Sequence, residues 1–172
     1  MDSGTRLQLL KGIAQEIVTE EELKTLVETK SKLVAYDGFE PSGLAHLPVG
    51  IYRPLLLRDL LKANVKFKLL LADSFAWINE KVEGDLDNIQ VVGKYFLEVW
   101  KAAGVDMSKV EVVWHQDHLA NPEYWKKVML IAKNHSEKRT KRALQIAGRG
   151  EEVSHVAQLF YPSMQAADVF QL

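Results

Sequence analysis

Three polar side chains near the end of the chain have the spacing of a binding site on a helix. Tyr161, Gln165 and Asp168 occur at positions i, i+4 and i+7, which places them on one face. A phenol, an amide and a carboxylate on one face can hold a small polar ligand by hydrogen bonds. The alternative is that Tyr161 belongs to the core while the other two are surface residues, since polar helix residues are mostly exposed. Taken alone, the pattern favours this alternative.

A glycine-bearing loop early in the chain is the second candidate. The residues from Lys32 to Tyr36 are typical of a short buried strand, and the turn-rich segment from Asp37 to Gly43 follows them. Ligands of open α/β sheets sit beyond the carboxyl ends of strands, where such a loop lets phosphates reach backbone N–H groups. The loop matches neither G-x-G-x-x-G nor the P-loop pattern. By itself it indicates a nucleotide site only weakly.

The composition excludes several other chemistries. The chain has 172 residues and no cysteine, so it can form neither a disulfide nor a thiolate metal site. Its five histidines are scattered without His-x-x-x-His spacing, and we expect no metal held by the protein. The 22 basic and 23 acidic residues nearly cancel, so any surface for nucleic acid must be local.

The elements that must position these residues alternate between strands and helices, which predicts an α/β fold with a doubly wound, Rossmann-like parallel sheet. Two helices at the start, one of them capped by Thr19 and Glu22, form an expected N-terminal helical appendage over residues 1–31. Expected strands cover 32–36, 65–72 and 110–114, and expected helices cover 48–61, 85–103, 121–134, a segment after Ser136, and 153–170 with a break at Pro162.

The glycine-bearing loop also carries a resemblance to a known family. The segment from Pro41 to Gly50 resembles the "HIGH" signature region of class I aminoacyl-tRNA synthetases, and the segment from Tyr36 to Gly43 resembles the version of the tyrosyl branch. The resemblance implies that His46 lies near the ATP phosphates and stabilises charge as pyrophosphate leaves. Pro48 stands where the family usually has glycine or alanine, and proline removes an N–H group and adds bulk. The ATP-binding residues implied by the resemblance are Gly38, Phe39, Glu40, Gly43 and His46.

The helical segment from Tyr161 to Asp168 resembles the tyrosine-binding helix of archaeal and eukaryotic tyrosyl-tRNA synthetases. That resemblance implies that Asp168 and Tyr36 bond the phenolic hydroxyl of L-tyrosine, while Tyr161 and Gln165 hold its α-amino end. A buried pair of this kind would be left without a partner by phenylalanine. Phe75 stands where the family often has histidine, which would change polar contacts near the nucleotide.

The resemblance covers about residues 32–172 and implies a tyrosine–tRNA ligase. Such an enzyme activates L-tyrosine with ATP, by attack of the carboxylate on the α-phosphorus, and transfers it to tRNA(Tyr). Mg²⁺ would accompany the ATP phosphates. Residues 32–172 would be the first part of the catalytic domain, with a connecting helical insertion at about 119–150. The family's KMSKS loop and anticodon-binding domain are absent, so the fold is expected to be incomplete and this chain alone a poor catalyst.

The expected partners follow from the same resemblance. The connecting region forms the homodimer interface in the family and lies close to the acceptor stem of tRNA. A basic run occurs there, although a solvated helix face is the commoner reason for such a run; its members are Lys133, Lys138, Arg139, Lys141, Arg142 and Arg149. We expect a cytoplasmic protein, because the sequence shows no signal peptide and no apolar run of membrane-spanning length.

Two other functions fit the same residues. A catalytically silent synthetase-like module could bind tyrosine or RNA without activating it, as Pro48 and Phe75 suggest. A tryptophanyl-type synthetase could share the fold, because fold alone does not determine the substrate. The combination of Asp168 with Tyr36 favours a phenol over an indole.

Overall fold

The computed structural model describes residues 1–30, 32–146 and 155–172. Within these ranges the chain forms two compact units, each with its own core. The first unit comprises Met1–Gly38, Gly43–Leu70 and Val91–Val113. The second comprises Phe39–Ser42, Leu71–Gln90 and Trp114–Leu172.

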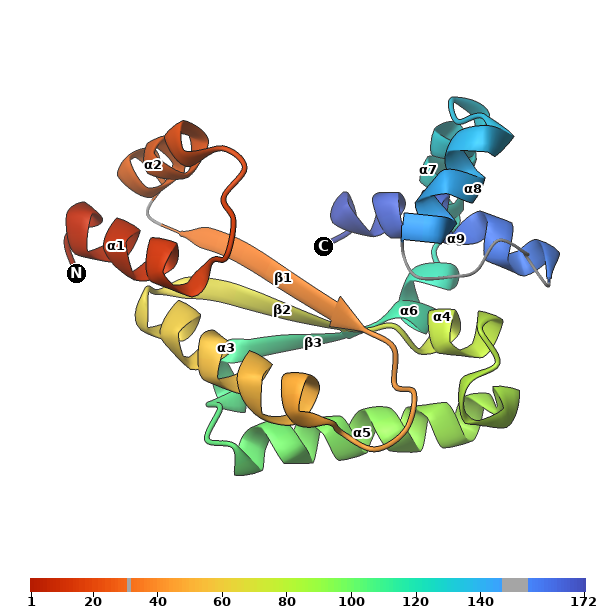
Figure 1. The fold of residues 1–172 in the computed structure, drawn as a ribbon, viewed down its shortest axis with the longest axis horizontal. Helices are drawn as coiled ribbons and strands as arrows, with labels where there is room; N and C mark the ends of the chain where they lie inside the picture. The colour runs from red at the N-terminus through yellow and green to blue at the C-terminus, as the bar shows by residue number, and fades with distance from the viewer. Residues whose placement is uncertain (31, 147–154) are drawn as a thin grey trace. The chain divides into compact units, whose positions relative to one another are not determined.

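The first unit is built on a three-stranded parallel sheet with the order β1-β2-β3 (Figure 1). The strands are β1 (Leu33–Phe39), β2 (Val65–Leu71) and β3 (Val110–Trp114). The central strand β2 is largely buried, as its apolar sequence predicts. The parallel α/β sheet expected from the sequence is therefore confirmed.

The first strand differs from its prediction in two ways. It continues through Asp37 and Gly38 to Phe39, where a turn was expected. A Cβ atom on Gly38 would lie 3.3 Å from Cβ of Leu70, so the glycine lets β1 pack closely against β2 instead of turning away. The strand also alternates between half-buried and exposed residues, with Val34 and Tyr36 exposed, because it forms an edge of the described sheet.

Two N-terminal helices, α1 (Ser3–Ile13) and α2 (Glu20–Thr29), belong to the first unit. Their apolar faces pack against the end of α3 (Arg53–Lys62) and the start of β2, through Leu10 and Val27 against Ala63 and Val65. Asp2 caps α1 by accepting a hydrogen bond from the backbone N–H of Thr5. Thr19 precedes α2 as expected, but its side chain makes no capping hydrogen bond, so the predicted capping box does not form.

Buried Arg6 ties these helices to the end of α3 (Arg53–Lys62). Its guanidinium donates hydrogen bonds to the carbonyl oxygens of Ala63 at 2.7 Å, Asn64 at 3.0 Å and Lys30 at 3.3 Å. The helix expected after Pro48 begins as one π-helical turn, η1 (Pro48–Tyr52), and continues as α3. Trp100 of α5 (Leu86–Ala102) fixes that turn by donating to the carbonyl of Val49 at 2.8 Å.

The second unit is helical. It contains α4 (Asp73–Ile78), α6 (His115–Leu119), α7 (Pro122–Lys133), α8 (Glu137–Ile146) and α9 (Val156–Val169), with a short 3₁₀ segment η2 (Lys81–Gly84). The core of the unit is formed by Ala72, Phe75, Tyr124, Val128, Met164 and Ala167. Asn121 caps α7 and Pro122 opens it, as the sequence predicts.

The predicted break at Pro162 is wrong, because this proline lies inside α9. The lost backbone hydrogen bond is tolerated where the flanking residues are packed on one side, and Ser163, Met164 and Ala167 are all buried. The expected start of this helix at Val153 lies outside the described residues.

Among the described residues, no helix combines the length and the apolar character needed to cross a membrane.

Candidate functional site: a buried carboxylate between two histidines

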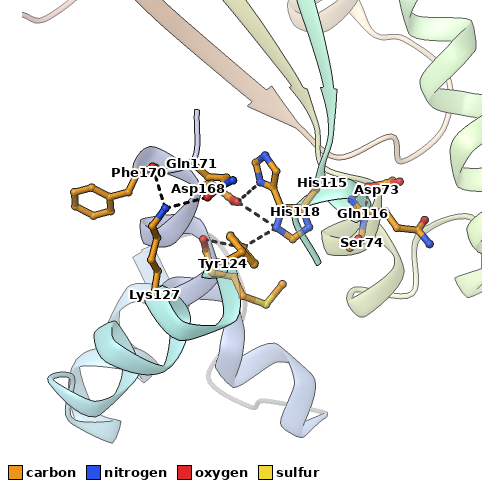
Figure 2. A network of polar contacts seen from close by, with 11 residues as sticks. Asp73, Ser74, His115, Gln116, His118, Tyr124, Lys127, Asp168, Phe170 and Gln171 are labelled. Carbon is orange, nitrogen blue, oxygen red and sulfur yellow. Dashed lines mark hydrogen bonds and ion pairs between the residues drawn. The ribbon is translucent and has the colours of Figure 1, made fainter. Parts of the chain in front are cut away.

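Asp168, on α9, is buried and faces two imidazoles (Figure 2). Its Oδ1 atom lies 3.0 Å from Nδ1 of His118 and 3.3 Å from Nε2 of His115, and both histidines belong to α6. The histidines are buried as well. Burial raises the pKa of the Asp168 carboxyl, but the hydrogen bonds and nearby imidazoles of His115 and His118 outweigh it, and the pKa lies below its ordinary value.

Tyr124 of α7 adds a hydroxyl to the same cluster. Its oxygen lies 2.8 Å from Nε2 of His115, and it donates to the backbone carbonyl of Met164 at 3.2 Å. The pKa of Tyr124 is raised, first by burial and then by the negative charge of Asp168. The phenol therefore stays protonated and remains a hydrogen-bond donor.

The hydrogen bonds determine which ring nitrogens carry protons. A carboxylate oxygen only accepts, so Nδ1 of His118 donates to Asp168. Nε2 of His115 lies 3.3 Å from the same acceptor oxygen of Asp168, so we assign it a proton as well, directed to Asp168 and to the Tyr124 oxygen. In the described part of the chain, buried Nδ1 of His115 has no hydrogen-bond partner. This agrees with a proton on Nε2, because no N–H is then left without an acceptor.

Asp73 holds α6 in place. It is buried at the start of α4, and its Oδ1 accepts the backbone N–H groups of Ser74 at 2.9 Å and Gln116 at 3.0 Å. Its Oδ2 accepts from the side-chain amide of Gln90 at 3.2 Å. Because Gln116 lies between the two histidines, this anchor sets the position of the short helix that presents them.

A second polar contact in this unit joins two predicted site residues. The Tyr161 hydroxyl donates to Oε1 of Glu40 at 3.1 Å, and the side-chain amide of Asn79 donates to the same oxygen at 3.0 Å. The Phe75 ring packs against both Tyr161 and His115, with ring centroids 4.4 and 4.3 Å away. Phe75 is therefore an apolar neighbour of both the Glu40 contact and the Asp168 cluster.

The remaining predicted site residues are placed as follows. Gln165 lies on α9 and is exposed, whereas Asp168 on the same helix is buried, so the surface interpretation of Asp168 is wrong. In the first unit, Tyr36 is 43% exposed on β1. His46 is exposed in the loop before η1, and its carbonyl accepts from the N–H of Gly50 at 2.7 Å.

Gly38 and Gly43, the two glycines predicted to bind ATP, are each required for a different structural reason. Gly43 has φ of +143° and nothing within 4 Å of an added Cβ, so its backbone conformation requires glycine and open space lies beside it. Gly38 is required by close packing against Leu70. Next to it, burial raises the pKa of Asp37, partly offset by the Arg53 guanidinium 3.0 Å away.

His115 and His118 were not among the site residues predicted from the sequence. Their i, i+3 spacing places both on one face of a helix, and this signal could have found them if α6 had been predicted. Together with Asp168 they offer three metal-ligating atoms within 4.8 Å of one another. In the structure, Oδ1 of Asp168 contacts both imidazoles directly, at 3.0 and 3.3 Å.

Comparison with known proteins places this geometry in context. A family model described as tRNA synthetases class I (W and Y) matches residues 28–172. The chain is 43% identical to tyrosine–tRNA ligase 1, cytoplasmic, of Arabidopsis thaliana, over 97% of this chain and 44% of that protein. It is 44% identical to the tyrosine–tRNA ligase of Sulfolobus acidocaldarius, over 99% of this chain and 47% of that protein.

Among solved structures, the Leishmania major tyrosyl-tRNA synthetase in complex with tyrosinol is similar, with a TM-score of 0.93 and 38% identity. The match covers 99% of this chain and 26% of that one. The chain thus spans less than half the length of these relatives.

Proposed function

Because the chain belongs to the family of class I tRNA synthetases (W and Y), we propose that it forms part of a tyrosine–tRNA ligase. The carboxylate of L-tyrosine would attack the α-phosphorus of ATP, which forms tyrosyl-adenylate and releases pyrophosphate. The tyrosyl group would then pass to tRNA(Tyr), and AMP would leave. In-line attack of a carboxylate on phosphorus depends on positioning and charge stabilisation more than on a protein nucleophile. Identities of 43–44% to relatives named tyrosine–tRNA ligases support this substrate over tryptophan.

The observation that carries the proposal is the buried, ionised Asp168. A carboxylate that can only accept hydrogen bonds suits the phenolic hydroxyl of tyrosine, which can donate one. The family resemblance implies that Tyr161 and Gln165 of α9 would hold the α-amino end of the amino acid. It also implies that Tyr36 would bond the phenolic hydroxyl. Glu40, already bonded to Tyr161, would be available to a charged ammonium nearby.

We assign ATP to Gly38, Phe39, Glu40, Gly43 and His46. Support in the first unit comes from the open space beside Gly43 and from the exposure of His46. Mg²⁺ would arrive bound to the ATP phosphates, where it neutralises charge. Pro48 opens η1, so its missing N–H falls where helices leave such groups unpaired, and ATP binding is compatible with it.

Residues 1–31 would be an appendage and 32–172 the first part of the catalytic domain, in a cytoplasmic enzyme. The connecting region at about 119–150 would form a homodimer interface. On α7, Met129 and Leu130 are 58% and 62% exposed beside a shallow hollow also lined by Pro122 and Trp125. Exposed Lys138, Arg139 and Arg142 of α8 are available to tRNA phosphates; Arg149 of this run lies outside the described residues.

Tyrosine-dependent exchange of pyrophosphate into ATP, measured with the intact protein, tests the proposal. We expect exchange that requires L-tyrosine and falls about 100-fold in a His46→Ala variant, the size expected for losing one charge-stabilising group. Gln8→Ala, which truncates an exposed side chain of α1, serves as the control and should leave the rate unchanged. Tyrosine binding with no exchange would support the silent module instead.

A further inference from the structure

The two histidines of α6 contact Asp168 from within the protein, and the family resemblance gave them no role. His118 Nδ1 and His115 Nε2 converge on a single oxygen, Oδ1, at 3.0 and 3.3 Å. We propose that His115 and His118 are positioning residues that fix the Asp168 carboxylate as an acceptor and thereby set the preference for tyrosine over phenylalanine. The inference rests on the proposed function, because it gives Asp168 a tyrosine ligand.

Two donors on one oxygen orient the carboxylate. An aspartate side chain can turn about its last torsion, which is broad. N–H groups that arrive at Oδ1 from two different rings oppose such rotation. A carboxylate accepts up to about four hydrogen bonds, so the two imidazoles leave capacity for a further donor from a ligand.

The donors themselves are held rigidly. The His115 ring packs against Phe75 and Tyr124, and its Nε2 is also bonded to the Tyr124 hydroxyl. The backbone of α6 between the two histidines is anchored by the hydrogen bond from the Gln116 N–H to Asp73. Neither imidazole can therefore withdraw without breaking buried contacts.

The preference for tyrosine follows because an ionised carboxylate in a fixed position needs a hydrogen-bond donor from the ligand. L-Tyrosine offers an O–H donor, whereas L-phenylalanine offers only C–H and would bury the carboxylate without a partner. If one imidazole donor is lost, the carboxylate can turn or take up a proton, and a protonated carboxyl no longer requires a donor from the ligand. Loss of a histidine donor should therefore weaken tyrosine binding, whereas phenylalanine binding should stay the same or become stronger.

The test uses isosteric pairs of substitutions in the intact protein. In His118→Asn the side-chain amide can donate from near the position of Nδ1, whereas His118→Leu keeps bulk without a donor. His115→Gln and His115→Leu form the matching pair for Nε2. Gln8→Leu, at an exposed position of α1 outside the proposed sites, is the control. The readout is the ratio of dissociation constants for L-phenylalanine and L-tyrosine from calorimetric titration, which does not depend on the fraction of folded protein.

We expect the ratio to fall at least about tenfold in His118→Leu and His115→Leu, the effect of one hydrogen bond to a charged group. It should stay within about threefold of the unmodified protein in the Asn and Gln variants. Equal losses for both amino acids in the Leu variants would show a merely structural role and overturn the inference.

Two further outcomes are distinguishable. An unmodified protein that prefers tyrosine, with the same preference in His118→Leu, refutes the positioning role and leaves the proposed function standing. An unmodified protein with no preference refutes both. Titration after EDTA treatment tests whether the cluster acts through a bound cation: an unchanged ratio supports direct hydrogen bonding, and a collapsed ratio overturns it.

Discussion

Nδ1 of His118 and Oδ1 of Asp168 lie 3.0 Å apart in the core of the second unit, although fifty residues separate them in the sequence. The contact joins α6 to α9 and keeps a buried carboxylate ionised. Buried charges are costly unless they are paired and hydrogen-bonded, so the arrangement is expected at a site that uses the charge.

The stability of the protein in acid should depend on the ionisation of Asp168. The pKa of Asp168 in the folded protein is lower than its ordinary value of 3.8, so its stabilising contribution is present above about pH 4 and is lost as pH falls through the folded pKa. The groups that face it are His115, His118 and Tyr124. We expect Asp168→Asn to destabilise the protein at pH 6, with the difference in unfolding free energy shrinking between pH 4 and pH 2. Urea denaturation at each pH measures it, and a difference independent of pH would contradict the lowered pKa.

The Tyr124 hydroxyl should contribute to stability. Tyr124→Phe removes the partner of His115 Nε2 and the donor to the Met164 carbonyl. The free energy of unfolding should fall by about 1–2 kcal/mol, because buried polar groups lose a partner. Tyr95→Phe, at a ring that is 40% exposed, is the control and should change stability by less than about 0.5 kcal/mol. Equal effects in chemical denaturation would mean that the hydroxyl contacts do not matter.

Replacing Asp73 with asparagine, its amide, should destabilise the protein. In Asp73→Asn, an NH₂ group would face the side-chain amide of Gln90 or the backbone N–H groups of Ser74 and Gln116. We expect a loss of about 2 kcal/mol, since hydrogen bonds to a buried charge are lost. Exposed Asp117, changed to Asn, provides the comparison. If the two variants unfold at the same urea concentration, Asp73 is not the anchor of α6.

Replacing Gly38 and Gly12 with alanine should change the stability of the protein in opposite directions. Gly38→Ala would place Cβ 3.3 Å from Leu70 Cβ and 3.5 Å from its carbonyl oxygen, and should cost about 1–2 kcal/mol by overpacking. Gly12→Ala, inside α1 with nothing within 4 Å, should stabilise by about 0.5 kcal/mol through helix propensity. Thermal denaturation of the pair checks the signs, and stabilisation by both would contradict the close packing of β1 on β2.

Much of the architecture follows from local sequence. The apolar run of β2 and the Asn121–Pro122 start of α7 are signals that depend on neighbouring residues alone, and both predictions are confirmed. The predictions at Gly38 and Pro162 are wrong because tertiary packing overrides the usual role of these residues. Gly38 packs closely against β2, and Pro162 lies inside α9 beside buried residues.

The candidate site was predictable only in part. Tyr161 and Asp168 were found from their spacing on one helix, together with the family resemblance. His115 and His118 were not, because α6 has only five residues and carries no periodic pattern long enough to predict. Their pairing with Asp168 depends on long-range folding, which residue spacing within one element does not report.

Calorimetric titration of the protein and its Asp168→Ala variant with L-tyrosine and L-phenylalanine tests the central claim most directly. We expect the unmodified protein to bind tyrosine at least about a hundredfold more tightly than phenylalanine. The variant should lose this preference, because tyrosine loses its acceptor and phenylalanine no longer leaves a carboxylate without a partner. A folded protein without the preference, or a variant that keeps it, would contradict the assignment of Asp168 to the phenolic hydroxyl.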